Sequence, residues 1–217
     1  MFLYKTGGGV MIKPLIIGIA GGAGSGKSTI SEKLKSINGE SKVQIIDQNS
    51  FIKDFSSMSF DERKKLNLDH PDSFDFDYLI RILKDLALGN TVSIPAFDFV
   101  SLERTDNFQN FTPKDIIIVE GSLILYEKKL RDLFDIKVFI DTDSDIRLIR
   151  RIIRDTKEKS MPLEKIILEY ISVVKPTNMN FVEPTKRFAD IIIPEGGENE
   201  VAINILNAKI KETFKHL

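Results

Sequence analysis

The feature that most constrains the fold is a glycine-rich run between an apolar stretch and a helical pattern. The run reads Gly21-Gly22-Ala23-Gly24-Ser25-Gly26-Lys27-Ser28-Thr29, which satisfies G-x-x-x-x-G-K-[ST]. Glycines let successive backbone N–H groups point inward at phosphate oxygens, and the following helix adds the partial positive charge of its N-terminus. The run therefore predicts that residues 21–29 bind ATP, with Lys27 on the β- and γ-phosphates and the Ser28 hydroxyl on Mg²⁺.

Apolar runs at regular intervals indicate the rest of the fold. They cover residues 15–20, 43–46, 116–119, 136–140 and 191–193, and each has the length of a buried parallel strand. Helical patterns lie between them, and the clearest spans residues 79–86. We therefore predict an α/β fold, a P-loop NTPase-type three-layer sandwich. Its mostly parallel five-stranded sheet carries helices on both faces, with a small β insertion near residues 91–104.

Some helix boundaries can be predicted as well. Ser59 has capping-box spacing, and Thr142 or Ser144 is expected to cap a helix that runs through Asp155. Pro162 and Pro176 are expected to bracket another helix.

Size and composition narrow the class of protein. The chain has 217 residues, 31 Lys and Arg against 32 Asp and Glu, and no cysteine. We expect a flexible N-terminal extension at residues 1–12 and one P-loop domain at residues 13–217. The balanced charge argues against a nucleic-acid partner, and no apolar run approaches the length of a membrane span. We expect a small-molecule substrate and a cytoplasmic location.

Two further patterns suggest a phosphotransferase. Glu120 ends the apolar run 116–119, where a carboxylate is suited to hold the metal, although a solvated strand-end acid is the simpler alternative. Arg147, Arg150, Arg151 and Arg154 share one face of a predicted helix. We expect a lid over the phosphates at about residues 147–165. The alternative is pairing of these arginines with nearby aspartates, Asp155 among them.

From Pro14 to Asn199 the chain resembles the uridine/cytidine kinase family. The segments that carry the resemblance are, in order, GIAGGAGSGKST, DQNSF, NLDHPDSFDFD, IPAFDF, VEGSLIL and the stretch from DIRLIRRIIRD to VKPTNMNFVEPTKRFADIIIPEGG. The resemblance implies transfer of the ATP γ-phosphoryl group to the 5′-hydroxyl of uridine or cytidine. It also implies a homo-oligomer.

The resemblance assigns roles to individual residues. It places Arg154 in the lid facing the phosphates, Asp69 on the ribose hydroxyls and Arg151 on the substrate side. Phe97 stands where the family commonly has a tyrosine against the base. Each has a structural alternative: Asp69 could cap a helix and Phe97 could belong to the core.

The chain departs from the family at the expected general base. The family's Asp-Ser-Phe reads Asn49-Ser50-Phe51 here, and an amide cannot take a proton. Asp47, two residues earlier, can share a face with Asn49 in an extended segment and substitute in part. The alternative is that Asp47 only ends its strand. On this view, Asn49→Asp should raise the activity.

The acceptor side departs as well. Leu102 replaces a histidine, Lys159 and Met161 replace two arginines, and Glu169 replaces a glutamine near the nucleoside. These changes argue for altered specificity. Two other functions therefore stay open, a kinase for another small hydroxyl compound and a nucleotide-binding protein with impaired catalysis.

Overall fold

A parallel five-stranded sheet forms the centre of the protein. In this computed structural model the structure describes residues 3–6 and 9–215, with the side chains of residues 13–214. The sheet order is β4-β7-β3-β8-β9, and every neighbouring pair is parallel. The strands are β3 (Leu15–Gly21), β4 (Val43–Asp47), β7 (Ile116–Gly121), β8 (Ile136–Asp141) and β9 (Ile191–Pro194). All five predicted strands are confirmed.

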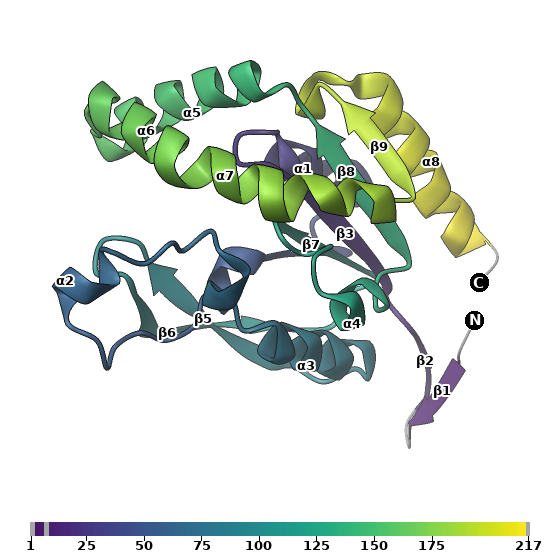
Figure 1. Cartoon of the computed structure of the whole chain (residues 1–217). Helices are drawn as coiled ribbons and strands as arrows, with labels where there is room; N and C mark the ends of the chain where they lie inside the picture. Colours follow the sequence, from purple (N-terminus) through teal and green to yellow (C-terminus); the bar gives the residue numbers. More distant parts are fainter. Residues whose placement is uncertain (1–2, 7–8, 216–217) are drawn as a thin grey trace.

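Helices cover both faces of this sheet, as predicted (Figure 1). Along the chain, the α-helices are α1 (Lys27–Asn38), α2 (Phe60–Arg63), α3 (Phe76–Ala87), α4 (Lys128–Arg131), α5 (Ser144–Lys159), α6 (Leu163–Glu169), α7 (Lys175–Thr177) and α8 (Glu200–Lys215), and α2 lies beside the segment of residues 92–111, away from the sheet. Residues alternate along each strand between two cores. On β7, Ile117 packs with α3, whereas Ile118 packs with α1 and α8. Because both sides of the strands are buried, they read as continuous apolar runs.

A separate antiparallel hairpin confirms the predicted β insertion. It consists of β5 (Val92–Asp98) and β6 (Glu103–Phe111), so it extends past residue 104. Its turn contains Leu102 at φ 58°, a left-handed conformation that leucine rarely adopts.

Near the N-terminus, β1 (Leu3–Thr6) pairs with β2 (Gly9–Ile12) in a two-stranded sheet of its own. Residues 1, 2, 7 and 8 lie outside the described part, and the expected flexibility of residues 1–12 stays a prediction.

Two predicted helix boundaries are wrong. The residue that precedes α5 is Asp143, in place of Thr142 or Ser144. Pro176 does not end a helix, because the helical backbone runs on through η3 (Tyr170–Val174), α7 and η4 (Asn178–Val182). Both η3 and η4 are π-helical turns, and the Lys175 N–H donates to the Tyr170 carbonyl five residues back. These wider turns rearrange the hydrogen-bond ladder where the proline lacks an N–H.

The remaining helical segments are short turns, and they complete the backbone. They are η1 (Gln48–Phe51), η2 (Pro71–Ser73), η5 (Glu183–Phe188) and η6 (Gly196–Glu198). The Ser59 capping box ahead of α2 is confirmed. Within the described residues, we find no helix with the length and apolar character that a membrane span requires.

Candidate active site

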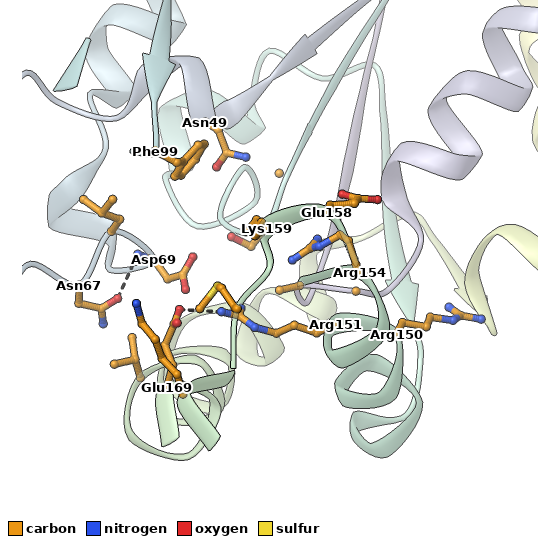
Figure 2. A pocket seen from close by; sticks show the side chains of 18 of the residues that line it. Asn49, Asn67, Asp69, Phe99, Arg150, Arg151, Arg154, Glu158, Lys159 and Glu169 are labelled. Carbon is orange, nitrogen blue, oxygen red and sulfur yellow. Dashed lines mark hydrogen bonds and ion pairs between the residues drawn. The ribbon is translucent and has the colours of Figure 1, made fainter. Parts of the chain in front are cut away.

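A cavity of about 1540 Å³ lies at the carboxyl ends of strands β3, β4 and β7. Ligands of open α/β sheets bind at this edge. The glycine-rich loop and Glu120 form one end of the cavity, and Asp69, Leu102, Met161 and Glu169 line the other end. Figure 2 shows Arg150, Arg151 and Arg154 of α5 beside this cavity, with Arg151 toward Asp69 and Glu169.

The phosphate-binding loop leads from β3 into α1. Gly26, at φ 97°, caps α1 in a left-handed conformation that glycine tolerates at little cost. The Lys27 ammonium donates to the carbonyls of Gly21 (3.0 Å) and Gly22 (3.1 Å). Burial lowers the pKa of Lys27, while the charges of Glu120 and Asp47 oppose this change.

Not every residue of the loop reaches the cavity. Those on its wall are Ala23, Gly24, Gly26, Lys27, Ser28 and Thr29. Gly21, Gly22 and Ser25 lie behind them, and the Ser25 side chain is fully buried. These three residues therefore shape the loop of the predicted nucleotide site and do not form its wall.

Glu120 lies at the end of β7, opposite Asp47 in the sheet register. Its two carboxylate oxygens accept hydrogen bonds from Ser28 Oγ (2.7 Å) and from Ser31 Oγ (2.6 Å). Burial raises the pKa of Glu120, and the two hydroxyls oppose that rise. A hydroxyl and a carboxylate are hard oxygen donors of the kind that Mg²⁺ uses together with substrate phosphates. The described residues contain no group of three or more His, Cys, Asp or Glu side chains that could hold a metal ion.

The Asn49 side chain is bound to Asp47. The Asp47 carboxylate accepts from the Asn49 backbone N–H (2.9 Å) and from its amide Nδ2 (3.2 Å). Both residues line the cavity together with Lys27 and Glu120. A carboxylate therefore does lie on the cavity wall beside the amide, with its orientation fixed by two donors.

The four arginines of α5 do not act as one group. Arg150, Arg151 and Arg154 line the cavity, but Arg147 does not. Arg147 is buried against the glycine-rich loop, and its Nε donates to the Thr142 carbonyl (3.0 Å). Arg147 and Arg151, one helical turn apart, share the buried face of α5, but Arg147 lies against the loop and not on the cavity wall. Figure 2 shows Arg150 extending away from Arg151.

At the other end of the cavity, Asp69, Arg151 and Glu169 point toward one another (Figure 2). Arg151 NH2 donates to Glu169 Oε1 at 2.6 Å. The Asp69 backbone N–H donates to Asn67 Oδ1, which holds the turn in place. Burial raises the pKa of Asp69, and the Arg151 charge opposes this rise.

The aromatic residue predicted against the substrate lies elsewhere. Phe97 packs against the core, whereas Phe99, two residues later, lines the cavity beside Leu102. Lys159 and Met161 also line it. The alternative that assigned Phe97 to the core therefore describes its position in the structure, because the strand bulges between Pro95 and Phe97.

Sequence reasoning missed Ser31 and Phe99. Ser31 lies one helical turn after Ser28, so its spacing already placed it on the same side of α1. Phe99 follows Phe97 by two residues and contacts its ring from the turn after β5, which was a usable signal for an aromatic pair but not for which of the two faces the cavity.

Comparisons with known proteins agree with this geometry. Residues 16–202 match the model of the Phosphoribulokinase / Uridine kinase family. The chain is 50% identical to a uridine kinase of Limosilactobacillus reuteri over 92% of both chains. It is 48% identical to a uridine kinase of Clostridium novyi, over 93% of this chain and 97% of that one. The solved phosphoribulokinase of Rhodobacter spheroides shares the fold, with a TM-score of 0.61 at 14% identity over 84% of this chain and 70% of the other.

Proposed function

Since the chain belongs to the Phosphoribulokinase / Uridine kinase family, we propose that it transfers the γ-phosphoryl group of ATP to the 5′-hydroxyl of uridine or cytidine. The products are ADP and the nucleoside monophosphate. Kinases of this family use ATP, and the two relatives at about half identity are both named uridine kinases.

The nucleotide end of the cavity supports ATP binding. The loop amides and Lys27 would hold the phosphates, and Ser28 and Glu120 would hold Mg²⁺. Bound there, the metal ion offsets charge on the β- and γ-phosphate oxygens. Ser31 keeps the second oxygen of Glu120 in place.

We propose that Asp47 is the general base. The proposal that the chain is an active enzyme depends mainly on this assignment, because Asn49 cannot accept a proton. Asp47 would accept the proton of the 5′-hydroxyl while the hydroxyl oxygen bonds to the γ-phosphorus. The bond between the γ-phosphorus and the β–γ bridging oxygen breaks in the same step, and ADP leaves. Asn49 would orient this carboxylate through the two hydrogen bonds described above. Its amide thus has a role that does not require proton transfer.

At the acceptor end, Asp69 would accept hydrogen bonds from ribose hydroxyls. Phe99 and Leu102 would pack against the base. Arg151 and Glu169, joined at 2.6 Å, would form the polar part of the wall. Arg154 would face the transferring phosphoryl group from α5.

The test is a steady-state ATP-to-ADP assay over a panel of nucleosides and other small hydroxyl compounds, run on the natural chain and on Asp47→Asn. We expect turnover with uridine or cytidine and a loss of about 10²- to 10⁴-fold in Asp47→Asn. Asp54→Asn is the matched control, because Asp54 is exposed and lies off the cavity wall.

The panel also separates the other candidate functions. Leu102 and Met161 make the acceptor wall less polar, which favours a kinase for a different small hydroxyl compound over strict uridine selectivity. ATP binding without turnover on any acceptor would contradict both kinase functions and support an impaired nucleotide-binding protein.

We further propose that the chain forms a homo-oligomer. Helix α5 exposes Ile146, Ile149 and Ile153, with exposed fractions of 40%, 52% and 51%. These residues lie at i, i+3 and i+7 and form an apolar stripe that a second copy could cover. Light scattering after size-exclusion chromatography gives the mass directly, and a monomer at micromolar concentration would contradict the proposal.

A further inference from the structure

A single buried carboxylate lies among the cations of the lid. Asp155, on α5, is fully buried. Its oxygens lie 3.3 Å from Arg151 Nε, 2.9 Å from Arg154 Nε and 3.2 Å from Lys159 Nζ. All three cationic side chains line the cavity, whereas Asp155 does not. Asp155 therefore contacts the groups that face the substrates without facing them itself.

The three cations are held to different degrees. The Arg151 side chain is 10% exposed, and a second carboxylate, Glu169, holds its NH2. Arg154 and Lys159 are 42% and 51% exposed. Arg151 thus forms an ion pair with Asp155 and a hydrogen-bonded pair with Glu169, while Arg154 and Lys159 contact Asp155 at one side and are open to the cavity at the other.

The contact to Arg154 leaves its binding surface free. Only Nε of Arg154 donates to Asp155, and within the described residues its two terminal nitrogens have no hydrogen bond. A guanidinium has five donors in a planar fork, so it can bind a carboxylate through Nε and a phosphoryl oxygen through its terminal nitrogens. A lysine ammonium has no such fixed geometry.

The ionised state of Asp155 suits this role. Burial alone would raise its pKa, but the hydrogen bond from Arg154 and the charges of Arg154 and Lys159 outweigh it and hold the pKa below the usual range. Three cations against two carboxylates, Asp155 and Glu169, leave an excess of one positive charge toward the cavity. A transferring phosphoryl group is the charge that such an excess stabilises.

The other end of α5 is fixed to the phosphate-binding loop. Arg147 Nε donates to the Thr142 carbonyl, and Thr142 Oγ1 donates to the Ser25 carbonyl at 3.0 Å. Asp155 is therefore carried on a helix whose first turn is held against the nucleotide loop.

We propose that Asp155 is a positioning residue for phosphoryl transfer, which holds the Arg154 guanidinium through Nε so that its terminal nitrogens face the transferring group. This inference rests on the proposed function for the identity of the transferred group. It assigns a role to a residue that does not touch ATP or the acceptor.

The first test is Asp155→Asn in the full chain, with Mg²⁺-ATP and the best acceptor of the panel. The substitution keeps the size of the side chain and removes its charge. We expect kcat to fall about 10- to 100-fold, with the KM for ATP within about threefold of the natural value, because the interaction acts mainly in the transition state. Asp145→Asn is the matched control, since Asp145 is exposed on the same helix and lies off the cavity.

A positioning role differs from a purely structural one in a double-mutant cycle. If Asp155 acts through Arg154, then adding Asp155→Asn to Arg154→Ala costs little further activity. If Asp155 only stabilises the fold, the two losses multiply. Multiplicative losses, or a kcat for Asp155→Asn within about threefold of the natural chain, overturn the proposal.

Arg154→Lys covers the case in which Asp155→Asn does not fold. Arg154 is 42% exposed, so this variant should fold as judged by its melting curve. It keeps the charge but cannot bind a carboxylate and a phosphoryl oxygen in one fixed plane. We expect it to lose nearly as much kcat as Arg154→Ala, and natural turnover in Arg154→Lys overturns the proposal.

A binding readout separates this proposal from the proposed function. Calorimetry with ADP, Mg²⁺ and aluminium fluoride probes the transferring group without turnover. We expect Asp155→Asn to weaken aluminium fluoride capture on ADP about tenfold or more while ADP alone binds as before. Lack of uridine turnover in the natural chain contradicts the proposed acceptor only, whereas equal fluoride capture in both chains contradicts the role of Asp155.

Discussion

The nucleotide end and the acceptor end of the cavity differ in how closely they keep the expected motif. At the nucleotide end, Lys27 bonds to a carbonyl of the loop and Ser28 bonds to Glu120. At the acceptor end, Asn49, Leu102, Met161 and Glu169 all depart from the family pattern. The phosphates of ATP require one arrangement of backbone amides, whereas an acceptor can be held by several sets of side chains.

The departures at the acceptor end are accompanied by compensating contacts. Asn49 donates to Asp47, and Glu169 accepts from Arg151. A substituted motif residue therefore cannot be judged alone, because the function of the original side chain can move to a neighbour. The following predictions test how far the two ends differ.

The largest effect is expected at the nucleotide end. Lys27→Ala removes the ammonium that reaches the phosphates, so kcat/KM for ATP should fall on the order of 10³-fold. Lys35→Ala is the control, because Lys35 lies on the same helix but does not line the cavity. Its ammonium pairs with the Glu40 carboxylate at 3.1 Å. A Lys27→Ala variant with natural ATP affinity and turnover would contradict the assignment of the loop.

Exchanging Asp47 and Asn49 tests the acceptor end. The double variant Asp47→Asn with Asn49→Asp should recover about 10- to 100-fold of the activity that Asp47→Asn loses. Asn49→Asp alone should change turnover by less than about tenfold, because the new carboxylate faces Asp47 at hydrogen-bond distance and the two repel. This expected gain is smaller than the sequence alone suggests. A double variant no better than Asp47→Asn would show that the proton goes elsewhere.

A smaller effect is expected at Glu169. Glu169→Gln weakens the pair with Arg151 and replaces an acceptor-only group by an amide that both donates and accepts. The uridine kcat/KM should rise about tenfold relative to that for cytidine, whose amino group suits a carboxylate better. Glu183→Gln serves as the control, because Glu183 is exposed and lies off the cavity wall. An unchanged ratio would mean that Glu169 does not read the base.

The smallest effect is one of stability. Because burial raises the pKa of Asp69, the folded protein binds this proton more tightly than the unfolded chain. The contribution of this proton to the free energy of unfolding is therefore fully present below the pKa of the unfolded chain. It is lost as the pH rises through the pKa of the folded protein. Asp69→Asn should raise the free energy of unfolding by about 1 kcal/mol at pH 7, which corresponds to about 2–4 °C in Tm. The increase should be smaller near pH 4. An equal change at both pH values would contradict this; the acceptor KM should rise in the same variant.

The sheet was predictable because its strands are buried on both faces and each appears as a short apolar run. The cavity end of each strand followed from the parallel order, which is why Glu120 could be placed. The boundaries at Asp143 and Pro176 could not be predicted, because capping and π-helical turns depend on the local backbone path. The same holds for Phe97 and Phe99, because Phe97 lies within β5 whereas Phe99 lies in the turn that follows it.

The helical backbone from Leu163 to Val182 has a mechanical consequence. One end carries Glu169 at the mouth of the acceptor site, and Asn178, near the other end, lies against Gly22 of the nucleotide loop, where an added Cβ would approach Asn178 Oδ1 to 2.6 Å. From Leu163 to Asn178 the helix is about 22 Å long at 1.5 Å per residue. If the helix tilted by about 5° about Asn178, its Leu163 end would move by about 2 Å. A tilt of this segment about its contact with the nucleotide loop would therefore change the width of the acceptor site.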